Sequence, residues 1–202
     1  MNNKIILTIG RQFGSGGREI GKKLAKALNI AYYDKELMAL AAKESGLSEE
    51  FFEKADERAS SGLSYAFTMG YSYMGLFTPY NDILSNDRLF LYQSDTIRNL
   101  AEKGSCVIVG RCADYILRER TDCLNVFIYG NTEDRVKRVI EEHRVPDAEA
   151  EVHVKKRDKK RAAHYKYITD QEWGDVKNYN LCLDSSKLGI EKCIALILEC
   201  VQ

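Results

Sequence analysis

A glycine-rich stretch near the N-terminus carries residue types that suit phosphate chemistry. The segment GRQFGSGGRE, residues 10–19, follows the apolar run IILTI and precedes a segment with helical periodicity. A glycine loop between a strand and a helix presents unpaired backbone N–H groups at the positive end of the helix dipole, where proteins bind phosphate. We therefore expect a phosphate site formed by Gly10, Gly14, Ser15, Gly16, Gly17, Arg18 and Glu19.

The loop lacks the lysine of an ordinary P-loop. The pattern G-x-x-x-x-G-K-[ST] fits no register: with Gly16 as the second glycine, Arg11 stands at the first glycine and Gly17 at the lysine. Shifting by one residue places Arg18 at the lysine and Glu19 at the hydroxyl that usually binds magnesium. Arg18 and Arg11 are therefore the candidate replacement cations, and Glu19 is a candidate metal ligand because a carboxylate suits a hard cation.

Two other interpretations of the loop remain open. Gly10, Gly14 and Gly16 also fit the G-x-x-x-G-x-G loop of NAD(P)-dependent short-chain dehydrogenases, with Asp34 placed to bind a ribose. Those enzymes need a Y-x-x-x-K pair, and no tyrosine here has a lysine four residues later, so this alternative is remote. The glycines could also serve only a tight turn.

The surrounding sequence alternates apolar runs with helical periodicity. Predicted strands cover residues 5–9, 30–33, 106–110, 124–129 and 180–184, and predicted helices cover 17–28, 35–44, 88–103, 133–143 and 190–201. This alternation predicts an α/β fold with a parallel sheet and right-handed crossovers. NTED at 131–134 and TDQE at 169–172 both fit helix starts. Residues 59–86 break the pattern and are expected to be an insertion.

Composition limits the classes of partner. Thirty basic and thirty acidic side chains cancel, so the overall charge favours neither nucleic acid nor an anionic membrane as a partner. The six cysteines form no C-x-x-C pair, and no apolar run is long enough to span a membrane. We expect a cytoplasmic protein with reduced cysteines.

Several segments, taken in order, resemble the cytidylate kinase-like family. They are IGRQFGSGGREIGKKLAKAL, YYDKELM, LYQSDTIRNLAEKGSCVIVGRCADYIL, VFIYGNTEDRVKRV, RDKKRAAHYKY and WGDVKNYNLCLDSSKLGIE. The resemblance implies a three-layer P-loop kinase-like fold, with a five-stranded parallel sheet flanked by helices. It also implies one domain over residues 1–202, with an acceptor-side insertion at about 59–86 and a helical lid at about 145–178.

The same resemblance assigns further site residues. Asp34, Gln93, Gly110 and Arg111 match acceptor-binding positions, although Asp34 also suits a helix N-cap. Cys112 replaces the family's aspartate, and Asp114 follows two residues later as a candidate substitute. In the lid, Arg157, Asp158 and Arg161 match part of the family's arrangement, whereas the neighbouring lysines fit a solvated helix face.

These assignments predict phosphoryl transfer that depends on ATP and Mg²⁺. The expected acceptor is a pyrimidine nucleoside monophosphate such as CMP or dCMP, with Arg18, Arg11, Arg157 and Arg161 as catalytic cations. The metal would bind through Glu19 or only through the phosphates. The altered loop keeps a second hypothesis open, a nucleotide-binding sensor of the same fold with weak or no catalysis. The sequence leaves the acceptor, the donor base and the oligomeric state undetermined.

Overall fold

The computed structural model describes residues 4–34, 37, 80–143 and 145–201. The chain divides into two compact units, one comprising Met1–Asp34 and Leu100–Gln202 and the other Lys35–Asn99. In the second unit the described part is Leu37 and the portion of helix α5 (Tyr80–Lys103) up to residue 99. The predicted helix at 35–44 lies almost wholly outside the described residues, as does the insertion as far as residue 79.

A five-stranded parallel sheet forms the centre of the first unit. Its order is β2 (Ala31–Tyr33), β3 (Cys106–Val109), β1 (Ile6–Arg11), β4 (Cys123–Tyr129) and β5 (Leu181–Asp184). All five predicted strands are confirmed within two residues of their expected ends. Because β1 is central, the glycine loop that follows it lies at the middle of the carboxyl edge of the sheet, where open α/β sheets bind ligands.

The strand order excludes the dehydrogenase alternative. In the dinucleotide-binding fold the second strand pairs with the first, giving the order 3-2-1-4-5-6. Here β3 lies between β1 and β2, with Ile6 of β1 and Ala31 of β2 both paired to Cys106 of β3. The short-chain dehydrogenase hypothesis is therefore wrong.

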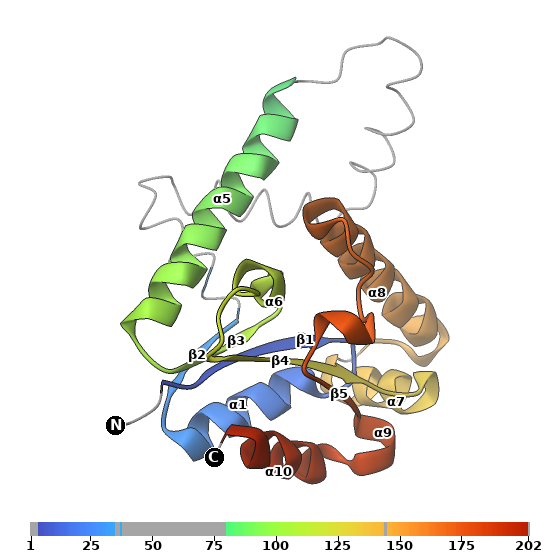
Figure 1. Ribbon diagram of the computed structural model, residues 1–202. Coiled ribbons are helices and arrows are strands. Elements are labelled where there is room, and N and C mark those ends of the chain that lie inside the picture. Colours follow the sequence, from blue (N-terminus) through green and yellow to red (C-terminus); the bar gives the residue numbers. More distant parts are fainter. Residues whose placement is uncertain (1–3, 35–36, 38–79, 144, 202) are drawn as a thin grey trace. The chain divides into compact units, whose positions relative to one another are not determined.

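Helices cover both faces of this sheet, which explains why its strands are continuous apolar runs. On one face α1 (Gly17–Leu28) and α10 (Ile190–Val201) pack against each other and against the sheet (Figure 1). Leu7, Ile9, Ile20, Leu24 and Ile197 form the centre of that core and are fully buried. The other face carries α6 (Ala113–Ile116) and α8 (Asp147–Thr169) (Figure 1).

The remaining short elements are α7 (Thr132–His143), the 3-10 turn η1 (Val176–Asn178) and α9 (Ser185–Leu188). Helix α7 begins as NTED predicts, because Asn131 Oδ1 accepts a hydrogen bond from the Asp134 N–H at 2.8 Å. The same interpretation of TDQE is wrong. Thr169 is the last residue of α8, and Asp170 closes the helix in the left-handed conformation, with φ 55°.

None of the helices within the described residues is long and apolar enough to cross a membrane.

Candidate functional site

The glycine loop is a compact turn between the end of β1 and the start of α1. Gly14 and Gly16 have φ angles of 78° and 76°, which favour glycine. Their neighbours are also too close for a side chain. A Cβ at Gly14 would lie 2.5 Å from the Arg135 carbonyl oxygen, and one at Gly16 would lie 2.4 Å from Ile190 Cδ1. The loop thus exposes the first N–H groups of α1, which have no partner within the helix.

Ser15 takes a structural part in this loop. Its side chain is buried, and its hydroxyl lies 2.9 Å from the Gln12 carbonyl oxygen and 3.1 Å from that of Ile128 on β4. The Gln12 N–H also donates to the Ile128 carbonyl, at 3.0 Å. The hydroxyl therefore holds the loop against the sheet. Because the hydroxyl is engaged there, Ser15 could contribute to phosphate binding only through its backbone.

Glu19 does not fit a metal site held by the protein. Lys23 Nζ lies 2.8 Å from one carboxylate oxygen, and Arg138 Nη1 lies 3.1 Å from the other. The hydrogen bond from Lys23 is the largest cause that lowers the Glu19 pKa, so the carboxylate is charged and already neutralised by two cations. Within the described residues, no three His, Cys, Asp or Glu side chains gather as metal ligands.

Asp34 lies beside two of the loop's arginines. Arg18 Nε is 2.6 Å from Asp34 Oδ2, and Arg11 Nη2 is 3.6 Å from Asp34 Oδ1. Asp34 is 6% exposed, so these two ion pairs lie in a place largely shielded from water. The β2 carboxylate and the glycine loop therefore form one site at the carboxyl edge of the sheet.

Helix α8 brings further arginines to the same loop. Arg161 Nη1 donates to the Arg11 carbonyl oxygen at 3.0 Å. The Arg161 and Arg157 guanidinium carbons lie 5.4 Å and 5.6 Å from the centre of the Phe13 ring, within range of cation–π attraction. The middle of α8, within the predicted lid, thus lies against the glycine loop.

This arrangement concentrates positive charge. Burial lowers the pKa of Arg161 to about 9, and the neighbouring Arg11 lowers it as well. Burial also lowers the pKa of Arg11 to about 10, although Asp34 opposes the shift, and Arg111 and Arg18 lower it further. Because like charges are held together in a poorly solvated place, a bound anion would relieve their repulsion. The cluster is therefore suited to a polyphosphate.

Asp158 holds the loop to both flanking helices. Its Oδ1 accepts a hydrogen bond from the Phe13 N–H at 2.7 Å, while Oδ2 is paired with Arg135 of α7. Arg135 Nη1 also donates to the Phe13 carbonyl oxygen at 3.2 Å. Sequence reasoning did not assign Phe13 or Arg135 to the site. Phe13 carried no signal beyond its place in the loop, and the basic face of α7 could equally have faced solvent.

The turn after β3 brings Arg111 toward the same place. Gly110, Arg111 and Cys112 are three consecutive left-handed residues, with φ angles of 74°, 60° and 54°. A left-handed conformation costs a non-glycine residue on the order of 1–2 kcal/mol, so this turn is held by its surroundings. Arg111 is within electrostatic range of Arg11, whereas the Cys112 side chain is buried.

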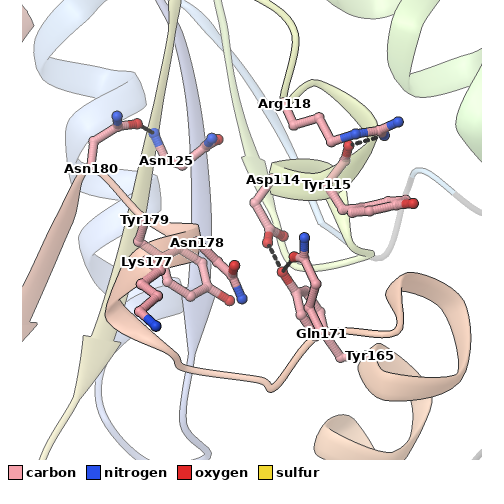
Figure 2. A pocket seen from close by; sticks show the side chains of 10 residues that line it. All are labelled: Asp114, Tyr115, Arg118, Asn125, Tyr165, Gln171, Lys177, Asn178, Tyr179 and Asn180. Atoms are coloured by element: carbon pink, nitrogen blue, oxygen red, sulfur yellow. Dashed lines mark hydrogen bonds between the residues drawn. The ribbon is translucent and has the colours of Figure 1, made fainter.

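The remaining acceptor candidates are Gln93 and Asp114. Gln93 is a buried residue of α5 in the second unit. Asp114 faces a separate polar cavity of about 260 Å³ on the α6 side of the sheet (Figure 2). That cavity is lined by Asp114, Tyr115, Arg118, Asn125, Tyr165, Gln171, Lys177, Asn178, Tyr179 and Asn180.

Asp114 is fixed inside this cavity by a tyrosine of α8. Its Oδ2 accepts a hydrogen bond of 2.7 Å from the Tyr165 hydroxyl, and burial raises the pKa of the Asp114 carboxyl (Figure 2). The buried Tyr179 hydroxyl lies beside this pair and has no hydrogen-bond partner of good geometry among the described residues. Asp114 therefore joins α6 to α8, and the structure does not support its assignment to the Arg11–Asp34 site.

Comparison with known proteins gives one family. The model of the cytidylate kinase-like family matches residues 6–187. A cytidylate kinase of Methanopyrus kandleri is 22% identical over 98% of this chain and 93% of its own length. The crystal structure of an uncharacterised protein from Eubacterium ventriosum is 30% identical, covers 98% of each chain and superimposes with a TM-score of 0.73. A shikimate kinase of Bacteroides thetaiotaomicron, 13% identical over 98% of each chain with a TM-score of 0.52, shares the fold.

Proposed function

Because the chain belongs to the cytidylate kinase-like family, we propose that it transfers the γ-phosphoryl group of ATP to a pyrimidine nucleoside monophosphate such as CMP or dCMP. An oxygen of the acceptor's phosphate forms a bond to the γ-phosphorus, the bond from that phosphorus to the bridging oxygen breaks, and ADP leaves. The observation that carries the proposal is the group of arginines from three segments gathered over a glycine cradle.

Phosphoryl transfer needs mainly positioning and neutralisation of charge. The N–H groups at the start of α1 would hold the donor phosphates, and Arg11 or Arg18 would supply the charge of the missing lysine. Arg157 and Arg161 of α8 would close over the transferred group as the lid. Magnesium would arrive with ATP and neutralise phosphate charge.

The acceptor would lie beside the turn at Gly110 and Arg111, next to the place where Arg11 meets Asp34. Asp34 and Arg111 both interact with Arg11, which supports a common position at the sheet edge. Gln93 stays a proposed acceptor contact on the strength of the family resemblance. Cys112 offers no charge in place of the family's aspartate, so the base of the acceptor is the part of this proposal that an assay must establish.

An ADP-release assay with CMP, dCMP, UMP and a panel of small alcohols, in the presence of Mg²⁺, tests the reaction. We expect at least one pyrimidine monophosphate to raise ADP release above the ATP-only background. Arg157→Ala and Arg161→Ala should each lower turnover because they remove charge that faces the loop. Lys159→Ala is the matched control, since Lys159 is an exposed residue of the same helix, and its turnover should not change.

Two observations favour the sensor hypothesis. The loop lacks the lysine, and Asp158 and Arg161 already bind its backbone. If no acceptor raises ADP release while calorimetry still detects nucleotide binding, the kinase proposal gives way to the sensor.

A further inference from the structure

We propose that Arg11, rather than Arg18, is the cation that replaces the P-loop lysine, and that Asp34 is its positioning residue. The inference rests on the proposed function, because it concerns the γ-phosphate of a bound ATP. It assigns different parts to the two arginines and moves Asp34 from acceptor binding to the support of a phosphate-binding side chain.

The path of the Arg11 side chain carries the argument. A Cβ added at Gly17 would lie 2.5 Å from Arg11 Cβ and 3.0 Å from Arg11 Cγ. A Cβ added at Gly110 would lie 1.9 Å from Arg11 Nη1 and 2.9 Å from Arg11 Cζ. The side chain therefore leaves the end of β1, crosses the first residue of α1 and reaches the turn after β3. At Gly17 a side chain would meet the stem of Arg11, whereas at Gly110 it would meet only the movable guanidinium, and the φ of 74° is what favours glycine there.

The two ends of the loop have thus exchanged residue types. With Gly16 as the second glycine of the P-loop pattern, Arg11 stands at its first glycine and Gly17 at its lysine. The Arg11 side chain extends from the end of β1, and Gly17 at the start of α1 leaves room for it because it has no side chain. A lysine at residue 17 and an arginine at residue 11 would compete for one volume, so the chain can hold only one of them.

Arg11 is also better placed than Arg18 to act on phosphate. Its side chain is 17% exposed, whereas that of Arg18 is 43% exposed, and a charge shielded from water acts more strongly on a ligand. Arg18 makes the shorter contact with Asp34, at 2.6 Å, so it neutralises most of that carboxylate. Arg11 Nη2 lies farther away, 3.6 Å from Asp34 Oδ1, and a guanidinium has five N–H donors.

Nucleotide binding gives the first test. Calorimetry with ATP and with ADP, both with Mg²⁺, measures how much the protein prefers the nucleotide that carries a γ-phosphate. Arg11→Ala should abolish this preference and lower turnover by about 10²–10³-fold, the usual loss for one preorganised donor. Arg18→Ala should keep more of the preference, and Lys159→Ala should keep all of it. Added guanidinium ion should partly restore the Arg11→Ala protein.

Asp34 is tested through the same preference, which a merely structural role would leave unchanged. Asp34→Asn should reduce the ATP-to-ADP affinity ratio in the same direction as Arg11→Ala. Because Asp34 acts through Arg11, the double variant Arg11→Ala with Asp34→Asn should have the same ratio as Arg11→Ala alone. A further drop in the double variant would show that Asp34 also acts through its closer partner Arg18 or by itself, and would contradict its role as the positioning residue of Arg11.

A residue exchange gives the sharpest test. Gly17→Lys should disable the site because its Cβ meets Arg11, and Arg11→Gly should disable it because the cation is lost. The double variant Arg11→Gly with Gly17→Lys restores both the first glycine and the lysine of an ordinary P-loop. It should recover turnover at least tenfold over either single variant, with thermal unfolding used to confirm that all three proteins fold.

The outcomes separate this inference from the proposed function. Nucleotide binding without turnover overturns the kinase reaction alone, because the ATP-to-ADP ratio of the Arg11 variants can still be measured. An Arg11→Ala protein that keeps the wild-type ratio, or an exchange variant no better than the better single variant, overturns the inference alone. Failure of the wild-type protein to bind either nucleotide overturns both.

Discussion

Two buried carboxylates illustrate how the same residue type takes opposite parts in this protein. Asp34 is surrounded by Arg11 and Arg18, so its charge is compensated. Asp114 has a tyrosine hydroxyl as its closest partner, and burial raises the pKa of its carboxyl because the charged form is poorly solvated there. Two guanidinium groups therefore stand beside Asp34, whereas burial penalises the charged form of Asp114.

This difference gives a prediction for Asp114→Asn. The folded protein raises the Asp114 pKa above the ordinary value of 3.8, so ionisation of Asp114 costs stability as the pH rises through the folded-state pKa. Asparagine carries no charge and keeps an oxygen for the Tyr165 hydroxyl. Thermal unfolding should show the variant more stable than wild type at pH 8, with no advantage below pH 3.8. A gain of about 1 kcal/mol would raise the midpoint by roughly 2–4 °C.

Asp122 provides the control with the opposite sign. Its pKa is lowered, chiefly by the hydrogen bond from Arg120, whose Nη2 lies 2.8 Å from Asp122 Oδ2. That contribution is present above the ordinary pKa and is lost as the pH falls through the folded-state value. Asp122→Asn should therefore be less stable than wild type at pH 8. Loss of stability in both variants at pH 8 would contradict the interpretation of Asp114.

At the scale of elements, α7 and α8 are joined to the glycine loop through Arg135. This side chain is almost fully buried and binds both the Phe13 carbonyl oxygen and Asp158 of α8. Removing one partner of a buried pair leaves the other charge without compensation in a poorly solvated place. Arg135 is therefore expected to set the position of the loop between the two helices.

Arg135→Ala should destabilise the protein by about 3–5 kcal/mol, the usual cost of breaking a buried ion pair. Arg138→Ala is the matched control on the same helix, because Arg138 pairs with Glu19 and Glu142 at a partly exposed position. Its cost should be about 0–1 kcal/mol. Chemical denaturation measures both free energies of unfolding. Equal losses of stability in the two variants would show that the buried ion pair contributes no more than the exposed one.

The elements were largely predictable from sequence because each has a local signal. The strands are continuous apolar runs, and α1 and α10 begin and end at the predicted residues. The pattern at 169–172 was misread because a threonine followed three residues later by a glutamate can close one helix as well as open another. The contact of Arg11 with Gly110 was not predictable, since it joins residues almost a hundred positions apart. The position of Asp114 was not predictable either, because the direction of the chain before it depends on three left-handed residues.

At the scale of the whole molecule, the formal net charge is zero, but positive charge is concentrated around the glycine loop. The arginines of the loop, the β3 turn and α8 converge from segments far apart in the chain, and their excess charge is held in one partly buried place. Fields of this kind raise the local concentration of anions. Without an anion, folding brings these like charges together at a cost, so binding and stability are expected to be linked.

Sulfate or phosphate should therefore stabilise the protein more than chloride does at equal ionic strength. A ligand present at ten times its dissociation constant adds about 1.4 kcal/mol to the free energy of unfolding, which corresponds to a rise of roughly 3–6 °C in the midpoint. Sulfate also strengthens folding in general by its exclusion from protein surfaces, so the comparison must be made between variants. Arg161→Ala should lose most of the specific shift because it removes a charge that lies against the loop, whereas Lys159→Ala should retain it. An equal shift in wild type and both variants would leave only the general salt effect, and the arginine cluster would then not be an anion site.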